Sequence, residues 1–476
     1  MAAIAAMPGR LRNVCVLGHI DHGKSSLVDW LIAETGVIPT RLAGQLRYMD
    51  DLPDEQARGI TMRASAISIV YRHRGPPVQK WGLQHDDGNN DEDSRYLVTV
   101  VDSPGHIDFA YDALAAARSC DGAVIVVDVV EGVRAQTLSA LRTARAEKLH
   151  VVLVLNKVDR LCADETRRDP RDAWERLSRI VESLNAAHNA FDPASGNVVF
   201  ASAKHGWGFT LAQLARALAP RLGFRKDALT KVLFGEFALS ADGTKVVKRA
   251  PDADPLFATL VLAPLFQALR EDDDDGGESP VVRDHLFGGG AADAATSSSS
   301  SETKKKKNNM KKSASSFSLG AHAAVRERFP ASRAVLKAVA ETVPPPSHKL
   351  ARRKRLFSRQ KRALSSQNNE KCVAYVAKVF ANARADRVDA GDLLALTRVA
   401  AGEIRVGQTL RFRGETFLDN AASSESSSGG DQSSSSSDAY VEARIDTLFA
   451  LMGSSVVPID AAGAGRVVAL GPEACR

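Results

Sequence analysis

Short apolar runs alternate with longer amphipathic stretches along the first half of the chain. The runs are rich in valine and bounded by turn or charged residues, which is typical of strands buried on both faces of a sheet. They lie at 14–17, 65–71, 97–101, 123–127, 151–155 and 198–201. Helical spacing occupies 26–34, 108–119, 135–148 and 172–185. The alternation predicts an α/β fold with a mostly parallel sheet and helices on both faces.

The pattern changes after about residue 371, where short apolar runs are separated by closely spaced turn residues. These runs lie at 373–380, 393–398, 403–410, 441–451 and 466–470. Strands spaced in this way are typical of a small all-β barrel. We therefore expect a second, all-β domain after the α/β domain.

Three stretches interrupt these patterns, and we expect them to be surface insertions. Residues 72–95 lie between two strand-like runs and contain Gly, Pro, Asn and Asp clusters, which predicts a long hairpin insertion. Residues 271–320 contain runs of Asp, Ser and Lys, and residues 421–438 are rich in Ser. Such segments bury too little apolar area to offset the entropy of ordering, so both are expected to be disordered.

The domain organisation follows from these boundaries. The chain divides into an N-terminal tail (1–11), an α/β domain (12–270), the insertion (271–320), a connecting helical and basic segment (321–370) and the barrel (371–476). The connecting segment carries a basic cluster at 352–355, which either marks the entry to the next domain or serves nuclear targeting or RNA contact.

Composition limits the class of protein further. The 476 residues carry a net charge of +6, which permits a nucleic-acid or ribosomal partner, and the lysine run 304–307 is either an RNA contact or a solvated stretch. The five cysteines are scattered without C-x-x-C spacing, so we assign them no metal and expect a reducing compartment. No apolar run approaches the ~18 residues that a membrane span needs. The N-terminus lacks the long apolar core of a signal peptide. We expect a soluble cytoplasmic protein, monomeric and with no membrane contact.

A phosphate-binding loop follows the first apolar run. Residues 18–25 read G-H-I-D-H-G-K-S, which matches G-x-x-x-x-G-K-[ST] between a strand and a helix. Its glycines let backbone N–H groups converge on phosphates, Lys24 supplies a positive charge, and the Ser25 hydroxyl is a Mg²⁺ ligand. The fold is therefore predicted to be a P-loop NTPase. The residues expected at the nucleotide are His19, Asp21, His22, Gly23, Lys24, Ser25 and Ser26.

Two further elements are expected around the terminal phosphate. Asp102 ends the run 97–101 and can hold Mg²⁺ through a water, while Gly105 can offer its N–H to the γ-phosphate because it has no side chain. Thr61 precedes the run 65–71 and can give its hydroxyl to Mg²⁺ and its N–H to the γ-phosphate. Only a triphosphate has that third phosphate, so this segment can order with the ligand and release after hydrolysis.

Two elements predict that the base is guanine. The run 151–155 is followed directly by Asn156, Lys157 and Asp159. A carboxylate at this position can accept both the N1–H and the exocyclic amine of guanine. Adenine lacks those donors and would leave buried acceptors unpaired. Asn156 can bond N7 or brace the phosphate loop, and the Lys157 stem can cover the base. A backbone N–H from Ser202, Ala203 and Lys204 can reach guanine O6, so we expect GTP and Mg²⁺ as ligand and cofactor.

In this order, these motifs resemble a translational GTPase. The resemblance rests on the loop 18–25, the segments 54–61 and 102–106, and residues 156–159. Within the family, residues 41–50 and 59–68 are similar to eukaryotic elongation factor two and closer still to the elongation-factor-like GTPase of 60S subunit biogenesis. Residues 206–209 support that choice, and residues 398–410 resemble the barrel that follows the G domain in this family.

The resemblance implies roles for particular residues. His106 matches the catalytic histidine that orients the attacking water, and Ile20 and Ile60 match the apolar pair that hinders its entry. Asp21 matches a phosphate-loop residue implicated in the activated state. Together with Thr61 and Gly105, His106 and Asp21 complete the predicted catalytic set. No arginine finger is identifiable, so slow intrinsic hydrolysis is expected.

The resemblance also implies a function. It is GTP hydrolysis, stimulated by the ribosome, that promotes release of the anti-association initiation factor from the late cytoplasmic large subunit. The implied partners are the large subunit, with its rRNA and proteins, and the Shwachman–Bodian–Diamond syndrome protein. The family continues with three domains that this sequence does not contain. The alternatives are therefore an elongation-factor-two-type translocase and a truncated GTP-binding module without coupled output.

Overall fold

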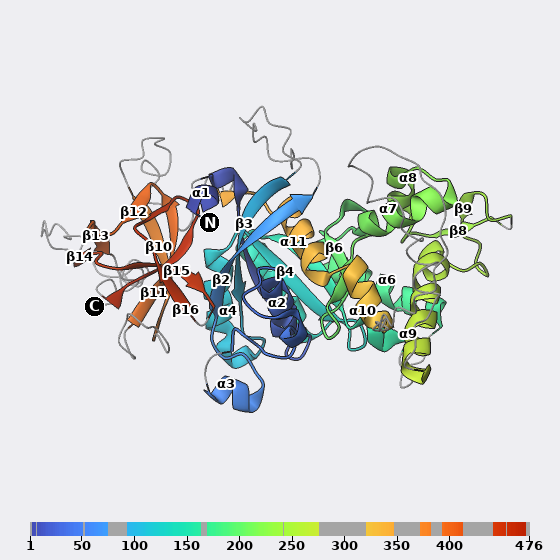
Figure 1. Cartoon of the computed structure of the whole chain (residues 1–476), viewed down its shortest axis with the longest axis horizontal. Coiled ribbons are helices and arrows are strands. Elements are labelled where there is room, and N and C mark those ends of the chain that lie inside the picture. The colour runs from blue at the N-terminus through green and yellow to red at the C-terminus, as the bar shows by residue number, and fades with distance from the viewer. Residues whose placement is uncertain are drawn as a thin grey trace, which may run out of the picture.

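A mixed sheet of twelve strands runs through the molecule (Figure 1). The computed structural model describes residues 2–5, 7–50, 53–74, 93–162, 169–240, 242–275, 320–346, 372–381, 393–412, 441–453 and 455–472. The α/β part of the sheet has the order β2-β3-β1-β4-β5-β6-β7. Its strands are β1 (Leu11–Gly18), β2 (Ser65–Arg74), β3 (Asp93–Asp102), β4 (Gly122–Asp128), β5 (His150–Asn156), β6 (Val198–Ser202) and β7 (Trp207–Phe209).

The central strands are parallel, as predicted. β1 pairs in parallel with β3 and β4, and β5 and β6 continue the parallel series, whereas β2 and β7 are antiparallel edges of this part. β2 and β3 form a hairpin whose register runs from Ser65↔Asp102 to Arg74↔Asp93. The paired strands thus take up both ends of the predicted insertion 72–95, and its residues 75–92 lie outside the described residues.

Both faces of this sheet are covered because side chains alternate along each buried strand. Val14 and Val16 of β1 join one core with α2 (Lys24–Ala33) and α11 (Ala331–Thr342). Cys15 and Leu17 join a second core with α4 (Ala110–Ser119) and α5 (Ala135–Ala146). The α/β fold class is confirmed. The remaining helices before β7 are α1 (Ala2–Ala5), η1 (Pro8–Arg10), η2 (Thr40–Leu42), α3 (Pro53–Arg58), η4 (Ile107–Phe109), η5 (Val158–Leu161), α6 (Pro170–His188) and η6 (Pro193–Ser195).

Part of the predicted connecting segment 321–370 packs inside the α/β region. α10 (Ala321–Arg328) leads into α11, whose Val335, Ala338 and Val339 are buried in the core beneath α2. Gly208 of β7 donates its N–H to the Phe329 carbonyl (2.8 Å), which joins this segment to the sheet edge. α11 is therefore a helix of the α/β core. The predicted basic cluster at 352–355 lies outside the described residues.

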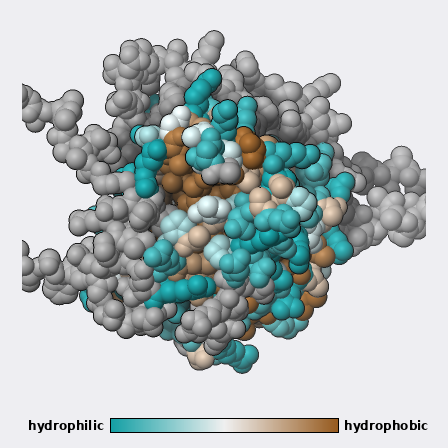
Figure 2. All heavy atoms as spheres, turned by 90° about the vertical axis from the view of Figure 1, so that its right-hand side faces the viewer, coloured by the Kyte–Doolittle hydropathy of each residue, from teal (hydrophilic) through white to brown (hydrophobic). Residues whose placement is uncertain are grey.

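The end of the molecule opposite the second domain is built from helices and a small hairpin (Figure 1). These elements are α7 (Leu211–Leu222), α8 (Lys226–Val232), β8 (Phe237–Leu239), β9 (Val246–Lys248), the π-helix η7 (Ala258–Leu262) and α9 (Ala263–Asp275). Figure 2 faces this end and shows an apolar patch surrounded by hydrophilic side chains. α9 runs into the acidic stretch that was predicted to open the disordered insertion 271–320. The helix therefore corrects that boundary, and residues 276–319 lie outside the description. Among the described helices, none is long and apolar enough to cross a bilayer.

The second region is rich in β-strands, as predicted. Its strands are β10 (Val373–Ala381), β11 (Leu393–Ala401), β12 (Glu403–Arg405), β13 (Thr409–Phe412), β14 (Val441–Arg444), β15 (Leu448–Met452), β16 (Ser455–Pro458), β17 (Ala461–Gly463) and β18 (Val467–Leu470). The predicted run 441–451 is two strands, β14 and β15, separated by irregular backbone at 445–447. Val399 of β11, Ile404 of β12 and Ala462 of β17 meet in one core, so separate sheets enclose a shared interior. Residues 413–440, including the predicted insertion 421–438, are outside the description.

Among the contacts that join the β-rich region to the α/β region, a strand pairing and a buried ion pair stand out. Met452 of β15 pairs with Ile67 of β2, which makes the sheet continuous. Arg398 of β11 is almost fully buried and lies 2.7 Å from Asp121 at the start of β4. Asn13 of β1 donates to the other Asp121 oxygen (2.9 Å). A buried ion pair is costly to break by removing one partner, so this cluster holds the two regions in one relative position.

Candidate nucleotide-binding site

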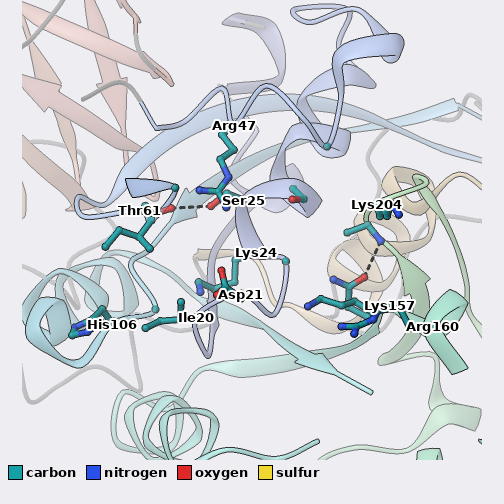
Figure 3. Close-up of a pocket in the computed structure, with 18 of the residues that line it drawn as sticks. Ile20, Asp21, Lys24, Ser25, Arg47, Thr61, His106, Lys157, Arg160 and Lys204 are labelled. Carbon is teal, nitrogen blue, oxygen red and sulfur yellow. Dashed lines mark hydrogen bonds between the residues drawn. The ribbon is translucent and has the colours of Figure 1, made fainter. Parts of the chain in front are cut away.

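A cavity of about 330 Å³ lies at the carboxyl ends of the parallel strands (Figure 3). Ligands bind at this edge of an open α/β sheet because the loops there leave a crevice. The loops after β1, β3, β5 and β6 all contribute, as does the segment before β2. The cavity is lined by Ile20, Asp21, Gly23, Lys24, Ser25, Ser26, Gly44, Arg47, Gly59, Ile60, Thr61, Gly105, His106, Asn156, Lys157, Asp159, Arg160, Ala203 and Lys204.

The phosphate loop closes tightly around its own lysine. Gly23 has φ +90°, and a Cβ there would collide with the Asn156 amide, so only glycine fits. Lys24 opens α2 and donates from Nζ to the His19 carbonyl (2.8 Å), which curls the loop over the ammonium group. Burial lowers the pKa of Lys24, and the nearby carboxylates of Asp102 and Asp21 oppose that effect. The loop thus concentrates positive charge and free N–H groups where phosphates would bind.

The predicted Mg²⁺ ligands lie together at one side of the loop. Ser25 Oγ and Thr61 Oγ1 are 2.8 Å apart, and Thr61 also donates to Asp50 Oδ1 (2.8 Å). Asp102 is fully buried, and its Oδ2 has no hydrogen-bond partner among the described residues. Burial raises the pKa of Asp102 to about 7 against the opposing charge of Lys24. Oxygen donors with a buried carboxylate oxygen left unsatisfied fit a hard divalent cation such as Mg²⁺.

The loop after β3 carries the predicted catalytic histidine. Gly105 lies against Lys24 Nζ, where a Cβ would collide with the ammonium group. His106 follows at the cavity rim beside Ile20, and its side chain is 37% exposed (Figure 3). Its Nδ1 accepts from the Asp108 N–H (3.2 Å) and lies 3.3 Å from the Asp108 carboxylate. Ile20 and Ile60, the predicted apolar pair, line the same cavity as His106.

The base end of the cavity is held by a hydrogen-bonded brace. Asn156 donates from Nδ2 to the His22 carbonyl (2.8 Å) and accepts at Oδ1 from the Ala203 N–H (2.8 Å). Of the two roles that the sequence allows for Asn156, the structure shows the brace. Lys157 has a left-handed backbone (φ 65°), and its Nζ is 2.7 Å from Asp128 at the end of β4. This contact draws the lysine stem along the cavity wall.

Asp159, the residue expected to read guanine, lines the cavity beside Lys157. Its Oδ2 lies 3.8 Å from His205 Nε2. Its Oδ1 is buried and has no hydrogen-bond partner in the part of the chain that the structure describes. A buried acceptor without a donor is costly, and a ligand that brings two N–H groups to this carboxylate removes that cost.

Four predicted residues support the cavity without lining it. His19 contacts Gln136, and the His22 ring is buried with Nδ1 3.3 Å from the Val126 carbonyl. Burial lowers the pKa of His22. Ser202 Oγ accepts from the His205 N–H (3.4 Å), and Asp102 lies beneath Lys24. The backbone of the loop, and not the side chains of its two histidines, therefore faces the cavity.

Sequence reasoning assigned no role to four residues that line the cavity: Gly44, Arg47, Gly59 and Arg160. Arg47 is the most informative, because it brings a cation from the segment before α3 to the phosphate end. The signal in the sequence was the position of Arg47 within residues 41–50, which carried the resemblance but suggested no contact. Only the folded segment shows where its side chain reaches.

Comparison with known proteins agrees with this geometry. Residues 9–270, just over half the chain, match the elongation factor Tu GTP binding domain. The chain belongs to this family. The predicted resemblance to translational GTPases is confirmed, and so is a site for GTP.

Individual relatives resemble about half of this chain. Ribosome assembly protein 1 of Saccharomyces cerevisiae is 39% identical in an alignment 299 residues long, which covers 55% of this chain and 26% of that protein. Elongation factor-like GTPase 1 of Homo sapiens is 38% identical in an alignment of the same length, which covers 53% of this chain and 25% of that protein. Ribosome assembly protein 1 of Schizosaccharomyces pombe is 38% identical in an alignment 282 residues long, which covers 54% of this chain and 27% of that protein. The chain thus spans about a quarter of the length of these relatives.

Proposed function

We propose that the protein hydrolyses GTP to GDP and phosphate during late cytoplasmic maturation of the large ribosomal subunit. The observation that carries the hydrolysis is the placement of Gly105 against the Lys24 ammonium group, with His106 lining the same cavity. The printed names of the relatives, Ribosome assembly protein 1 and Elongation factor-like GTPase 1, support the biological setting.

In the proposed mechanism, the chain contributes position and charge. Lys24 and the loop N–H groups would hold the β- and γ-phosphates, and Ser25, Thr61 and, through a water, Asp102 would hold Mg²⁺. The metal would neutralise charge on the phosphate oxygens. Gly105 would offer its N–H to the γ-phosphate.

His106 would turn from its contact with Asp108 toward the attacking water. Ile20 and Ile60, the expected apolar pair, line the same cavity, and the proposed turn would require a change in the segment that carries Ile60. Asp21, which lines the same cavity, would act in that activated state. The large subunit, with its rRNA and proteins, is the proposed trigger for this change. The other proposed partners are the Shwachman–Bodian–Diamond syndrome protein and the anti-association initiation factor.

The experiment that tests this proposal measures GTP turnover of the purified monomeric chain with and without large ribosomal subunits. We expect subunits to stimulate turnover. In His106→Ala, stimulated turnover should fall by about a hundredfold or more while GTP affinity is kept, since general catalysis by one positioned group contributes about 10²–10⁴-fold. His188→Ala at the end of α6, remote from the cavity, is the matched control.

The outcomes separate the candidate functions. Stimulation by subunits together with release of a bound anti-association factor supports the proposal. Stimulation only by complete translating ribosomes favours an elongation-factor-two-type translocase. GTP binding without any stimulation leaves a GTP-binding module and overturns the proposal for this chain, whereas normal stimulated turnover in His106→Ala removes His106 from its role.

A further inference from the structure

The backbone around Arg47 is held in a strained conformation by a buried carboxylate. Arg47 has φ 48°, in the left-handed region that non-glycine residues rarely occupy. Asp29 of α2 is fully buried, and its two oxygens accept the N–H groups of Arg47 (2.8 Å) and Tyr48 (2.9 Å). A strained residue that persists under such a clamp is a frequent feature of functional sites. The same helix begins with Lys24 and Ser25, so one rigid element positions both the phosphate loop and the turn at Arg47.

The clamp directs the Arg47 side chain into the phosphate end of the cavity. The guanidinium extends toward Ser25 and Thr61 (Figure 3). Its Nη1 is 3.8 Å from Asp50 Oδ2, and the other Asp50 oxygen accepts from Thr61. Gly59 lies beneath it with φ +64°, and a Cβ there would come within 3.1 Å of Nη1. Because Gly59 has no side chain, the Arg47 guanidinium has room to lie over it. The Arg47 side chain is 35% exposed, so it is free to adjust its position.

Two cations therefore converge where the terminal phosphate would lie. Lys24 and Arg47 line the same cavity, and the carboxylates of Asp21, Asp50 and Asp102 lie around Lys24. Like charges brought together at a cavity are repulsive until an anion binds between them. A planar guanidinium also matches phosphate oxygens in a way that an ammonium group does not.

We propose that Arg47 is a catalytic residue supplied by the chain itself, whose guanidinium contacts the γ-phosphate of GTP and stabilises charge that develops during hydrolysis. In that step the water oxygen bonds to the γ-phosphorus and the bond to the β–γ bridging oxygen breaks. The water proton leaves to phosphate or solvent, giving GDP and phosphate, and Arg47 neither gains nor loses a proton. The inference rests on the proposed hydrolysis of GTP but not on its stimulation by the large subunit. It replaces the expectation that the chain has no such arginine.

The test compares Arg47→Gln with wild type in the absence of ribosomal subunits. Two quantities are measured: single-turnover hydrolysis of GTP, and affinity for GDP against a non-hydrolysable GTP analogue. We expect hydrolysis to fall about tenfold or more, because arginines in this role contribute up to 10³–10⁵-fold when fully engaged. Affinity for the analogue should fall while affinity for GDP stays within about twofold, because only the analogue has a γ-phosphate. Arg47→Lys should recover part of both losses, since it keeps the charge without the planar fork.

Arg41→Gln is the matched control, because it removes an exposed arginine from the same segment outside the cavity. Wild-type hydrolysis in Arg47→Gln overturns the inference, as does an equal loss of affinity for GDP and the analogue. Melting temperatures of the variants with GDP bound distinguish a folding defect, which would lower both affinities together. A wild type that hydrolyses GTP but ignores large subunits would contradict the proposed biological function and leave the inference on Arg47 intact. A wild type without any GTP hydrolysis would overturn both.

Discussion

The two ends of the nucleotide cavity are built on different principles. At the base end, Asn156 and Lys157 use short contacts to the loop after β1, to Ala203 and to Asp128. These contacts are made within the protein and hold the segment that carries Asp159 in place. At the phosphate end, buried charges dominate: burial raises the pKa of Asp102 to about 7 and lowers that of Lys24.

This difference separates recognition from switching. The braced base end can accept guanine without rearrangement, so binding there costs little ordering. The phosphate end reaches its full set of interactions only with phosphates and a cation present. Arg47 and Thr61 reach it from the segment between α2 and β2, which is separate from the phosphate loop. A ligand shifts a conformational equilibrium only through contacts that differ between the states. GTP and GDP differ at this end alone, so this end should report which nucleotide is bound.

The largest effect should come from removing the lysine of the phosphate end. Lys24→Ala leaves the buried Asp102 carboxylate without its nearest cation and the phosphates without their main charge. Removing one partner of a buried charge pair costs about 3–5 kcal/mol, and a loss of that size in nucleotide binding is roughly 10²–10⁴-fold in affinity. Titration with fluorescent GDP and GTP should show this loss for both nucleotides. Lys226→Ala, an exposed lysine on α8, should bind both normally.

At the base end, Asp159→Asn should change which base is bound. The amide that replaces the carboxylate offers one acceptor and a donor, so guanine loses one partner and meets an unpaired N–H. Xanthine, which carries a carbonyl where guanine carries the amine, gains one. Affinity for GTP should fall about a hundredfold, since each hydrogen bond to a charged group contributes about 1.5–3 kcal/mol. Competition between GTP and XTP measures the exchange, and unchanged preference for GTP would remove Asp159 from base recognition.

The phosphate loop, Asp102, Asn156 and Asp159 could be predicted from sequence because their chemistry demands particular residue types at the ends of strands. The strands themselves could be predicted because a sheet buried on both faces requires continuous apolar runs. These two facts together place the ligands at one sheet edge. The mostly parallel sheet and the β-rich second region follow from the same periodicities.

Contacts set by long-range packing could not be predicted. The clamp of Asp29 on Arg47 joins residues 18 apart through a turn whose left-handed backbone has no glycine to mark it. α11 was assigned to a connecting segment because it follows the insertion, although its apolar spacing at Val335, Ala338 and Val339 suits a helix that covers a sheet. The brace by Asn156 was one of two roles that the sequence allowed, and only the folded loops, with His22 and Ala203 beside Asn156, show it.

Asn156→Ala tests whether the brace, and not a contact with the base, makes the base end rigid. The variant removes two hydrogen bonds and leaves the buried His22 carbonyl and Ala203 N–H without this partner. We expect a loss of about 1–3 kcal/mol in nucleotide affinity and a lower melting temperature. GTP and XTP should lose affinity in the same proportion, unlike the exchange in Asp159→Asn. A selective loss of guanine nucleotides would instead show that Asn156 reads the base.

The smallest expected effect concerns the clamp behind the phosphate end, and it appears as a dependence on pH. Burial raises the pKa of Asp29 from 3.8 to about 6, although the N–H groups of Tyr48 and Arg47 oppose this. The folded state therefore holds the proton more tightly than the unfolded state, so Asp29 contributes stability that is complete below pH 3.8 and lost as the pH rises through about 6.

The variant Asp29→Asn tests this dependence because its amide does not titrate. The free energy of unfolding of wild type relative to Asp29→Asn should fall by about 1–2 kcal/mol between about pH 4.5 and 7 and then stay level. Urea midpoints at each pH measure it, with exposed Asp227→Asn as the control. A flat difference would mean that Asp29 is already ionised at low pH, and that the turn at Arg47 rests on a fixed charge at every pH tested.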